Sequence, residues 1–253
     1  NKTLFDLGSN LYAYATDRGK LRARLAGREA PGGSKYTGHP VAAGRAAAVV
    51  VARVKHGGEW QAGMNYRPWS VLGDDLRQRA KLELKETSPV APGEAIAPEV
   101  NVLYLSGRAG CDLGADGGRW LKDFVSRGGF VFAEAPLGDA RFEAPLKTAL
   151  AQAELSLKSL GADSPFITGR FACGARGLDA SRAAYSFALQ AERMGQAGPL
   201  LCGIYSGDNL VGLYSPFDIM FSQTGCRAFG NRGYAPDDAR ALAINLAVYL
   251  GAR

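Results

Sequence analysis

The amino-acid sequence predicts an α/β fold, a three-layer domain in which helices cover both faces of a mostly parallel central sheet, with an antiparallel hairpin near the C-terminus. Two observations lead to this class. Between residues 46 and 150, short apolar runs typical of buried strands alternate with segments of helical periodicity, which indicates β-α-β units with right-handed crossovers. Beyond residue 183, the apolar segments become short and are joined by tight turns, which indicates antiparallel pairing.

The first 45 residues differ from the rest of the chain. Apolar side chains recur there three or four residues apart, at Leu4, Leu7, Leu11 and Tyr14. This spacing predicts an amphipathic helix over 3–17 that needs a surface to pack on. Residues 28–45 are rich in glycine and proline and show no periodicity, as in a linker. We therefore expect a helical extension over 1–27, a linker over 28–45 and an α/β domain over 46–253.

The formal charge is +6, from 30 Lys and Arg against 24 Asp and Glu, and five of the basic residues lie between Arg18 and Arg28. This basic run is either a solvated helix end or a contact for an acidic partner, an anionic membrane surface or nucleic acid. No aromatic-plus-basic recognition module supports nucleic acid specifically. Since no run of 18 apolar residues occurs, the sequence predicts no transmembrane segment, although peripheral membrane contact stays open.

The elements of the α/β domain follow in order. Three buried parallel strands are expected from apolar runs over 46–56, 100–107 and 130–135. Each precedes a segment of helical spacing, and these segments begin near Ser70, Arg119 and Phe142. Three short strands are expected over 183–190, 198–206 and 209–216, the last two forming a hairpin through Gly207 and Asp208. A final helix is expected from Pro236 to Leu250.

Candidate ligand-binding residues follow from the rule that ligands of open parallel sheets bind beyond the carboxyl ends of the strands. They are Trp60, Ser106, Gly107, Arg108, Glu134, Asp139, Arg141, Ser215 and Asp218. Trp60 could instead anchor the core, and Ser106 and Gly107 could shape a turn rather than cradle an anion beside Arg108. For Ser215 and Asp218, the alternative is an exit turn forced by the proline between them.

Glu134 is the unusual member of this set because a carboxylate that ends an apolar strand needs a partner or water. We expect it to form an ion pair with Arg108 or Arg141, and the alternative is that it acts as a general base. Either role would place it at the edge of the sheet beside the arginines.

Nucleophiles and metal ligands are few. His56 ends the first strand and Cys111 lies after the second, so a Cys111–His56 pair is a weak catalytic candidate. His56, Asp112, Glu134 and Asp139 could ligate a metal on chemistry alone, but their spacing gives no support, so we expect no metal and no cofactor. The four cysteines, at 111, 173, 202 and 226, include no C-x-x-C pair and leave disulfides open.

Several motifs resemble a known family. They are "ARVKHGGEW", "LYLSGRAGCDL", "WLKDFVSRGGFVFAEAPLGDARF", "LCGIYSGDNLVGLYSPFDI" and "ALAINLAVYL", which together span residues 46–250. In this order they resemble the bacterial domain of unknown function family 4159. The resemblance implies a flavodoxin-like or amidotransferase-like three-layer sandwich, similar to class I glutamine amidotransferase-like domains. It also favours a bacterial envelope or periplasmic protein, with the cytoplasm as the alternative.

The resemblance also implies where a nucleophile would stand. In a class I amidotransferase, the segment matching "FVFAEAPLGDARF" would carry a catalytic cysteine at its turn, assisted by a later histidine. Here the turn offers residues 134–137, which have no thiol or hydroxyl, and Ser164 stands where related sequences have histidine. The expected corner of the sheet therefore lacks its nucleophile.

Three hypotheses of function follow. The first is a non-catalytic module that binds a ligand, such as a small anion, or assembles with a protein. The second is a hydrolase or transferase that uses Glu134 or the Cys111–His56 pair. The third is self-association: the apolar stripe of the N-terminal helix would dock on a neighbouring copy or, as the alternative, on its own core.

Overall fold

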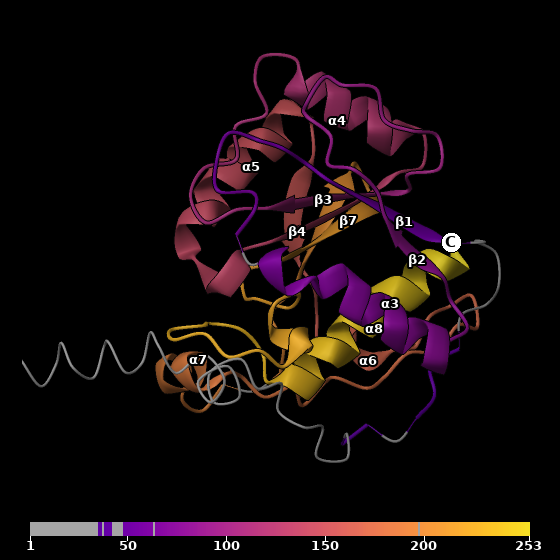
Figure 1. The fold of residues 1–253 in the computed structure, drawn as a ribbon, viewed down its shortest axis with the longest axis vertical. Helices are drawn as coiled ribbons and strands as arrows, with labels where there is room; N and C mark the ends of the chain where they lie inside the picture. Colours follow the sequence, from indigo (N-terminus) through magenta and orange to yellow (C-terminus); the bar gives the residue numbers. More distant parts are fainter. Residues whose placement is uncertain (1–34, 37, 42–47, 63, 197) are drawn as a thin grey trace, which may run out of the picture.

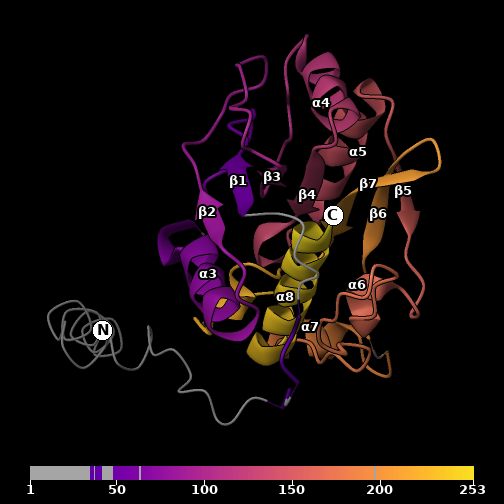
Figure 2. The same cartoon turned by 90° about the vertical axis from the view of Figure 1, so that its right-hand side faces the viewer.

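Figures 1 and 2 show the computed structural model, which describes residues 35–253 except 37, 42–47, 63 and 197. The predicted helical extension over 1–27 and most of the predicted linker over 28–45 lie outside the described residues. The α/β domain expected from residue 46 is described from Ala48 onward, with the two exceptions named above.

The described residues form a seven-stranded sheet in the order β2-β1-β3-β4-β7-β6-β5. The strands are β1 Val49–Arg53, β2 Leu84–Glu86, β3 Val102–Ser106, β4 Phe130–Glu134, β5 Ser156–Ser159, β6 Cys202–Ser206 and β7 Asn209–Ser215. Strands β2, β1, β3, β4 and β7 pair in parallel, and β6 runs antiparallel to both β7 and β5. The predicted class, a mostly parallel sheet with an antiparallel hairpin near the C-terminus, is confirmed.

Helices lie on both faces of this sheet. They are α3 Pro68–Arg79, α4 Gly117–Ser126, α5 Glu143–Gln152, α6 Pro165–Thr168, α7 Phe187–Glu192 and α8 Pro236–Ala252. Figure 1 shows α3 and α8 together on one face and α4 and α5 on the other. The short 3-10 turns are η1 Met64–Tyr66, η2 Pro136–Gly138, η3 Ala140–Phe142 and η4 Ser222–Thr224.

Two hydrophobic cores result because successive strand residues point to opposite faces of the sheet. In β4, Phe130 and Phe132 pack in the core under α3 and α8, whereas Val131 and Ala133 pack in the core under α4 and α5. All five residues of β4 are buried. By the same alternation, the side chain of Glu134 belongs to the α3/α8 face.

Two sequence expectations at the C-terminal end are confirmed and one is wrong. The hairpin β6–β7 turns at Gly207, whose φ is +60°, and the final helix α8 begins at Pro236. Residues 183–190, expected as a strand, instead contain the start of α7, and Phe187 is 90% exposed. Apolar residues at 185, 187 and 189 imitate the period of a strand, but only the first and the last are buried. The short edge strands β2 and β5 were not expected from the sequence.

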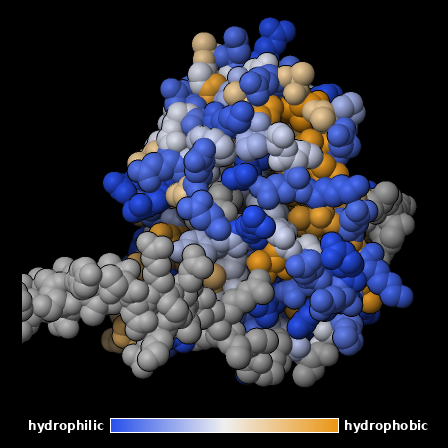
Figure 3. Space-filling model, viewed as in Figure 1, coloured by the Kyte–Doolittle hydropathy of each residue, from blue (hydrophilic) through white to orange (hydrophobic). Residues whose placement is uncertain are grey.

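Figure 3 shows hydrophilic residues over much of the described part of one face, with apolar residues between them. Among the described residues, no helix combines the length and the apolar character needed to cross a bilayer.

Candidate functional site

Three of the candidate residues end neighbouring strands and lie side by side. Ser106 of β3 pairs in register with Glu134 of β4, which pairs in turn with Ser215 of β7. All three are buried, with exposed fractions of 2%, 1% and 0%. The carboxyl ends of the parallel strands therefore meet where the sequence placed them, but beneath the surface of the protein.

The Glu134 carboxylate is surrounded by hydrogen-bond donors. Its Oε1 accepts a short hydrogen bond from the hydroxyl of Tyr104, and its Oε2 accepts from the backbone N–H of Ile219 at 2.9 Å and of Met220 at 3.1 Å. Burial, together with the negative charge of Asp218, raises the pKa of Glu134 to about 8 against the opposing effect of these hydrogen bonds.

The expected ion pair of Glu134 with Arg108 or Arg141 does not form, because the carboxylate points under the loop that follows β7 while both arginines pair with Asp139. The strand pattern could have identified one partner that sequence reasoning missed. Tyr104 lies two residues before Ser106, the register neighbour of Glu134, and therefore faces the same side of the sheet.

Asp218 is the second buried carboxylate at this edge, with an exposed fraction of 0%. Its Oδ2 accepts from the backbone N–H of Leu137 at 2.7 Å, and its Oδ1 accepts from the backbone N–H of Ser222 at 2.7 Å. Burial raises the pKa of Asp218 above its usual value, against the opposing effect of these hydrogen bonds. The Ser215 hydroxyl donates to the carbonyl of Phe217 at 2.5 Å. Asp218 and Ser215 therefore hold the turns after β4 and β7 together.

The turn after β4 has a constrained backbone. Leu137 has φ +55° and ψ +15°, a left-handed conformation that is unfavourable for a residue with a branched side chain. Gly138 follows with φ +67°, and a Cβ atom there would come within 2.1 Å of the carbonyl oxygen of Arg232. The strand-turn-helix elbow expected from the sequence is present, with leucine at its left-handed position.

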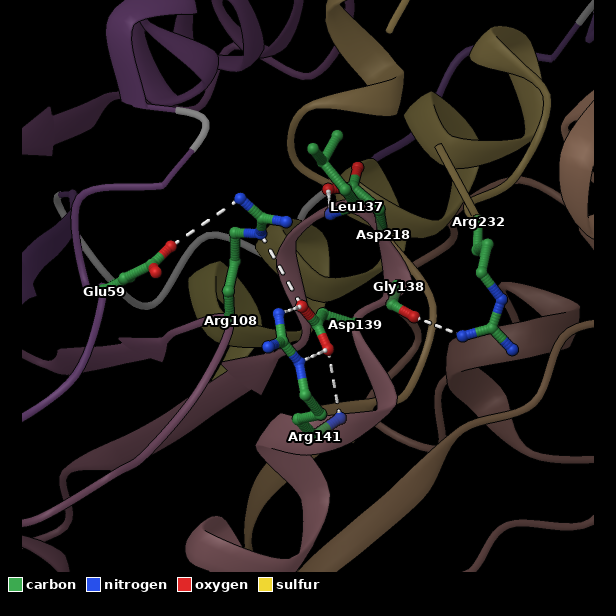
Figure 4. Close-up of polar contacts among 8 residues, drawn as sticks. All are labelled: Glu59, Arg108, Leu137, Gly138, Asp139, Arg141, Asp218 and Arg232. Carbon is green, nitrogen blue, oxygen red and sulfur yellow. Dashed lines mark hydrogen bonds and ion pairs between the residues drawn. The ribbon is translucent and has the colours of Figure 1, made fainter. Parts of the chain in front are cut away.

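Arginines and acids lie on the outside of this turn, as Figure 4 shows. Arg141 donates two hydrogen bonds to Asp139, from Nε to Oδ1 at 2.9 Å and from Nη2 to Oδ2 at 2.6 Å. Hydrogen bonding from Arg141 is the main reason why the pKa of Asp139 is lowered. Arg108 is held less closely, with 3.6 Å from its Nε to Asp139 and 3.7 Å from its Nη1 to Glu59.

Arg108 is thus held by two long ion pairs. Its Nε is buried and makes no hydrogen bond to another described residue. The side chain as a whole is 43% exposed, and that of Arg141 is 67% exposed. Two neighbouring guanidinium groups with this exposure are an arrangement that recognises carboxylates and phosphates.

A third arginine at the turn was not expected from the sequence. Arg232 donates from Nη1 to the carbonyl of Gly138 and from Nε to Glu192 at 2.9 Å. It lies in an irregular segment before α8, where neither periodicity nor a motif marks it. Only the tertiary contact with the turn after β4 identifies this residue.

His56 and Cys111 lie in adjacent loops but do not form an activated pair. The loops join through Gly57 and Asp112, whose backbones exchange hydrogen bonds of 2.7 and 3.0 Å. His56 is buried, its Nε2 is 2.8 Å from the carbonyl oxygen of Ser106, and its Nδ1 has no hydrogen-bond partner among the described residues. Cys111 packs in the α4/α5 core, and burial raises the pKa of its thiol to about 12. The thiol is therefore protonated at neutral pH, and burial also lowers the pKa of His56.

The remaining candidates differ in their surroundings. Trp60 is partly exposed, and the guanidinium of Arg53 lies 5.6 Å from its ring centroid. Gly107 is buried where a Cβ atom would come within 2.8 Å of the His56 ring. Within the described part of the chain, no three His, Cys, Asp or Glu side chains gather as metal ligands, and the four cysteines are unpaired.

Comparisons with known proteins give no match: no protein-family model, no curated protein and no solved structure is significantly similar to this chain.

Proposed function

We propose that this domain is a non-catalytic binding module that holds a small anionic ligand, a carboxylate or a phosphate, at the carboxyl edge of its sheet. The observation that carries the proposal is the pair of partly or largely exposed guanidinium groups at this edge, of which Arg108 is held by ion pairs of 3.6 Å to Asp139 and 3.7 Å to Glu59. A guanidinium offers five N–H donors in a planar fork that matches these anions. Arg141, on the other side of Asp139, adds a second exposed cation.

Three features support binding without catalysis. The left-handed position of the elbow carries Leu137, whose side chain has no atom that can attack a carbonyl. Glu134 is 1% exposed and its oxygens already accept hydrogen bonds, so it lacks contact with a substrate. Cys111 is buried with a raised pKa, which disfavours the thiolate that a nucleophile requires.

Anion titration tests the proposal. We expect citrate and inorganic phosphate, titrated at low ionic strength and followed by calorimetry, to bind with one site per chain. Loss of one charge-assisted hydrogen bond costs about 1.5–3 kcal/mol, so Arg108→Gln should weaken binding at least about tenfold. Arg141→Gln should weaken it by a smaller factor, because that guanidinium already holds Asp139 with two hydrogen bonds.

Arg77→Gln is the matched control. Arg77 is 68% exposed on α3 and pairs with Asp74 at 3.1 Å, so the substitution removes the same charge from another place. Equal weakening by the substitutions at 77 and 108 would mean that only net charge attracts the anion. That result, or the lack of any binding, would contradict the proposed site.

The alternative, a hydrolase or transferase, is favoured by one observation, the pKa of Glu134 near 8. A carboxyl group poised near neutral pH suits general acid-base catalysis. Turnover of amide and ester panels that disappears in Glu134→Gln or Cys111→Ser would establish this alternative and overturn the binding module. We expect no turnover above background.

Membership of the bacterial family 4159, and with it an envelope or periplasmic location, is also a proposal. Its support is the order of the motifs over residues 46–250. An alignment of relatives tests it: we expect the left-handed glycine at 138 and the acids at 134 and 218 to be retained, because each fixes a turn at the sheet edge.

A further inference from the structure

An apolar groove of about 610 Å³ lies between the start of α7, the loop after η4 and the start of α8. Pockets that hold small molecules have volumes of about 300–1,000 Å³ and mostly apolar or aromatic linings. Aromatic side chains form much of the wall here: Phe187 comes from the start of α7, Phe229 from the loop and Tyr234 from the segment before α8. The groove therefore has the size and the lining of a site for an organic molecule.

Two of these aromatic side chains are in contact with water. Phe187 is 90% exposed and Phe229 is fully exposed, whereas Tyr234 is buried. Phe229 belongs to a loop bounded by Gly225 and Gly230, which both have φ +73°, a left-handed conformation that glycine adopts without strain. An apolar molecule in the groove would remove the two exposed rings from water and gain ring-to-ring contacts with them.

The charge at the groove is positive. Among the described residues that line it, Arg227 is the only one with a formal charge at neutral pH, and its side chain is exposed. Two acids close to the lining residues are paired with arginines. Glu192 of α7 accepts from Arg232 at 2.8 Å, and Asp237 of α8 forms an ion pair with Arg240 at 3.5 Å. With these acids paired, the charge of Arg227 favours a ligand whose polar end is an anion.

We propose that the groove binds a small amphiphilic carboxylate, a molecule with an aromatic or alkyl body and one carboxylate. The body lies against Phe187, Phe229 and Tyr234. The carboxylate faces the guanidinium of Arg227, whose planar donors match it. This ligand site is separate from the anion site proposed at Arg108, because the groove and the arginines at the sheet edge share no lining residue.

Native cysteines of the full-length chain report on occupancy of the groove. Cys226 lines the groove and is partly exposed, whereas Cys173 is exposed elsewhere and serves as an internal control. The experiment measures the alkylation rate of each thiol by N-ethylmaleimide, with peptide mass spectrometry, at increasing concentrations of 6-phenylhexanoate. The matched alcohol, 6-phenylhexan-1-ol, is the uncharged control ligand. Both are titrated at low ionic strength.

We expect 6-phenylhexanoate to slow the reaction of Cys226 about tenfold when the groove is nine-tenths occupied, and to leave Cys173 unchanged. The alcohol should do the same only at higher concentration, because it lacks the charge that faces Arg227. Inorganic phosphate and citrate, the ligands expected at Arg108, should leave the Cys226 rate unchanged. The groove and the site at the sheet edge are thereby tested separately.

Three variants locate the two ends of the ligand. Phe229→Ser should weaken the carboxylate and the alcohol about tenfold each, because both lose the contact with one phenyl side chain. Arg227→Gln should weaken only the carboxylate, by about two- to fivefold, as for an exposed ion pair. Arg77→Gln is the matched control, since it removes the same charge from an exposed position on α3 and should weaken neither ligand.

A Cys226 rate that does not change with 6-phenylhexanoate would overturn the proposal, as would equal slowing at Cys226 and Cys173. Equal affinities of the carboxylate and the alcohol for the wild-type chain would contradict the preference for an anion. Equal weakening of the carboxylate by the substitutions at Arg77 and Arg227 would contradict it as well, because net charge alone would then attract the ligand.

Discussion

Replacing Glu134 by glutamine removes a buried titratable group while keeping the shape of the side chain. Its amide oxygen can still accept from the backbone N–H groups of Ile219 and Met220, and its amide nitrogen can donate to the Tyr104 oxygen. We therefore expect the fold to persist. The change should appear in how the free energy of unfolding depends on pH.

The sign follows from the raised pKa. The pKa of Glu134 is about 8 in the folded protein against 4.5 for the free group, so between these values the folded state holds a proton that the unfolded chain has lost. Stability from this group is complete below pH 4.5 and falls as the pH rises through 8. At about 1.4 kcal/mol per pH unit, the fall from pH 5 to pH 8 amounts to roughly 4 kcal/mol.

Other groups contribute pH dependence of their own. The pKa of His56 is lowered because the side chain is buried. Protonation of His56 below pH 6.5 therefore favours the unfolded state, and the free energy of unfolding rises with pH in that range. The readout is therefore the difference between wild type and Glu134→Gln, in which the contribution of His56 cancels.

Urea unfolding at five pH values from 5 to 9, followed by tryptophan fluorescence, measures this difference. Trp69 is buried with its ring 5.0 Å from that of Tyr104, so it reports on the same region. We expect the variant to gain stability relative to the wild type by several kcal/mol as the pH rises. Glu83→Gln, at a side chain that is 54% exposed, is the control and should show no such trend. A difference between wild type and Glu134→Gln that stays constant with pH would refute the reasoning.

Three further predictions concern stability and reactivity. Gly138→Ala should lower the free energy of unfolding by about 2–4 kcal/mol in urea titrations, because of its positive φ and a contact of 2.1 Å, whereas Gly207→Ala, with positive φ but open space, should lose only about 1 kcal/mol. Cys111 should stay unmodified by iodoacetamide at pH 8 while Cys173 reacts, and rapid modification that His56→Ala slows would contradict this. Asn245→Ala removes three buried hydrogen bonds of 2.7–2.9 Å and should cost about 2–4 kcal/mol; a loss below 1 kcal/mol would mean that water replaces them.

Local patterns were sufficient for the central strands and the last hairpin. Strands β1, β3 and β4 are continuous apolar runs because both faces of each are buried. The edge strands β2 and β5 have mostly exposed residues and only three and four positions, so no local pattern distinguishes them from loops. At α7, apolar residues in alternation indicated a strand, yet Phe187 points into water.

The sequence predicted where the candidate site lies, but not which contacts its side chains make. The sequence placed Ser106, Glu134 and Ser215 at one edge, because parallel strands end together. It did not place Arg232 there, nor did it identify the backbone amides of Ile219 and Met220 that bind Glu134. The amides lie 85 and 86 residues from Glu134 in the sequence, and Arg232 lies in an irregular segment.

By itself, the sequence determined the central strands of the covered sheet and the residues of the turn after the third of them, 134–137, because apolar runs and turn glycines are local properties of the chain. The tertiary structure alone decided the surroundings of each charge. Glu134 received main-chain amides and a tyrosine hydroxyl, and Arg108 received two ion pairs of 3.6 and 3.7 Å. A charged group takes its partners from whatever the fold brings within hydrogen-bonding distance, and sequence separation does not encode that distance.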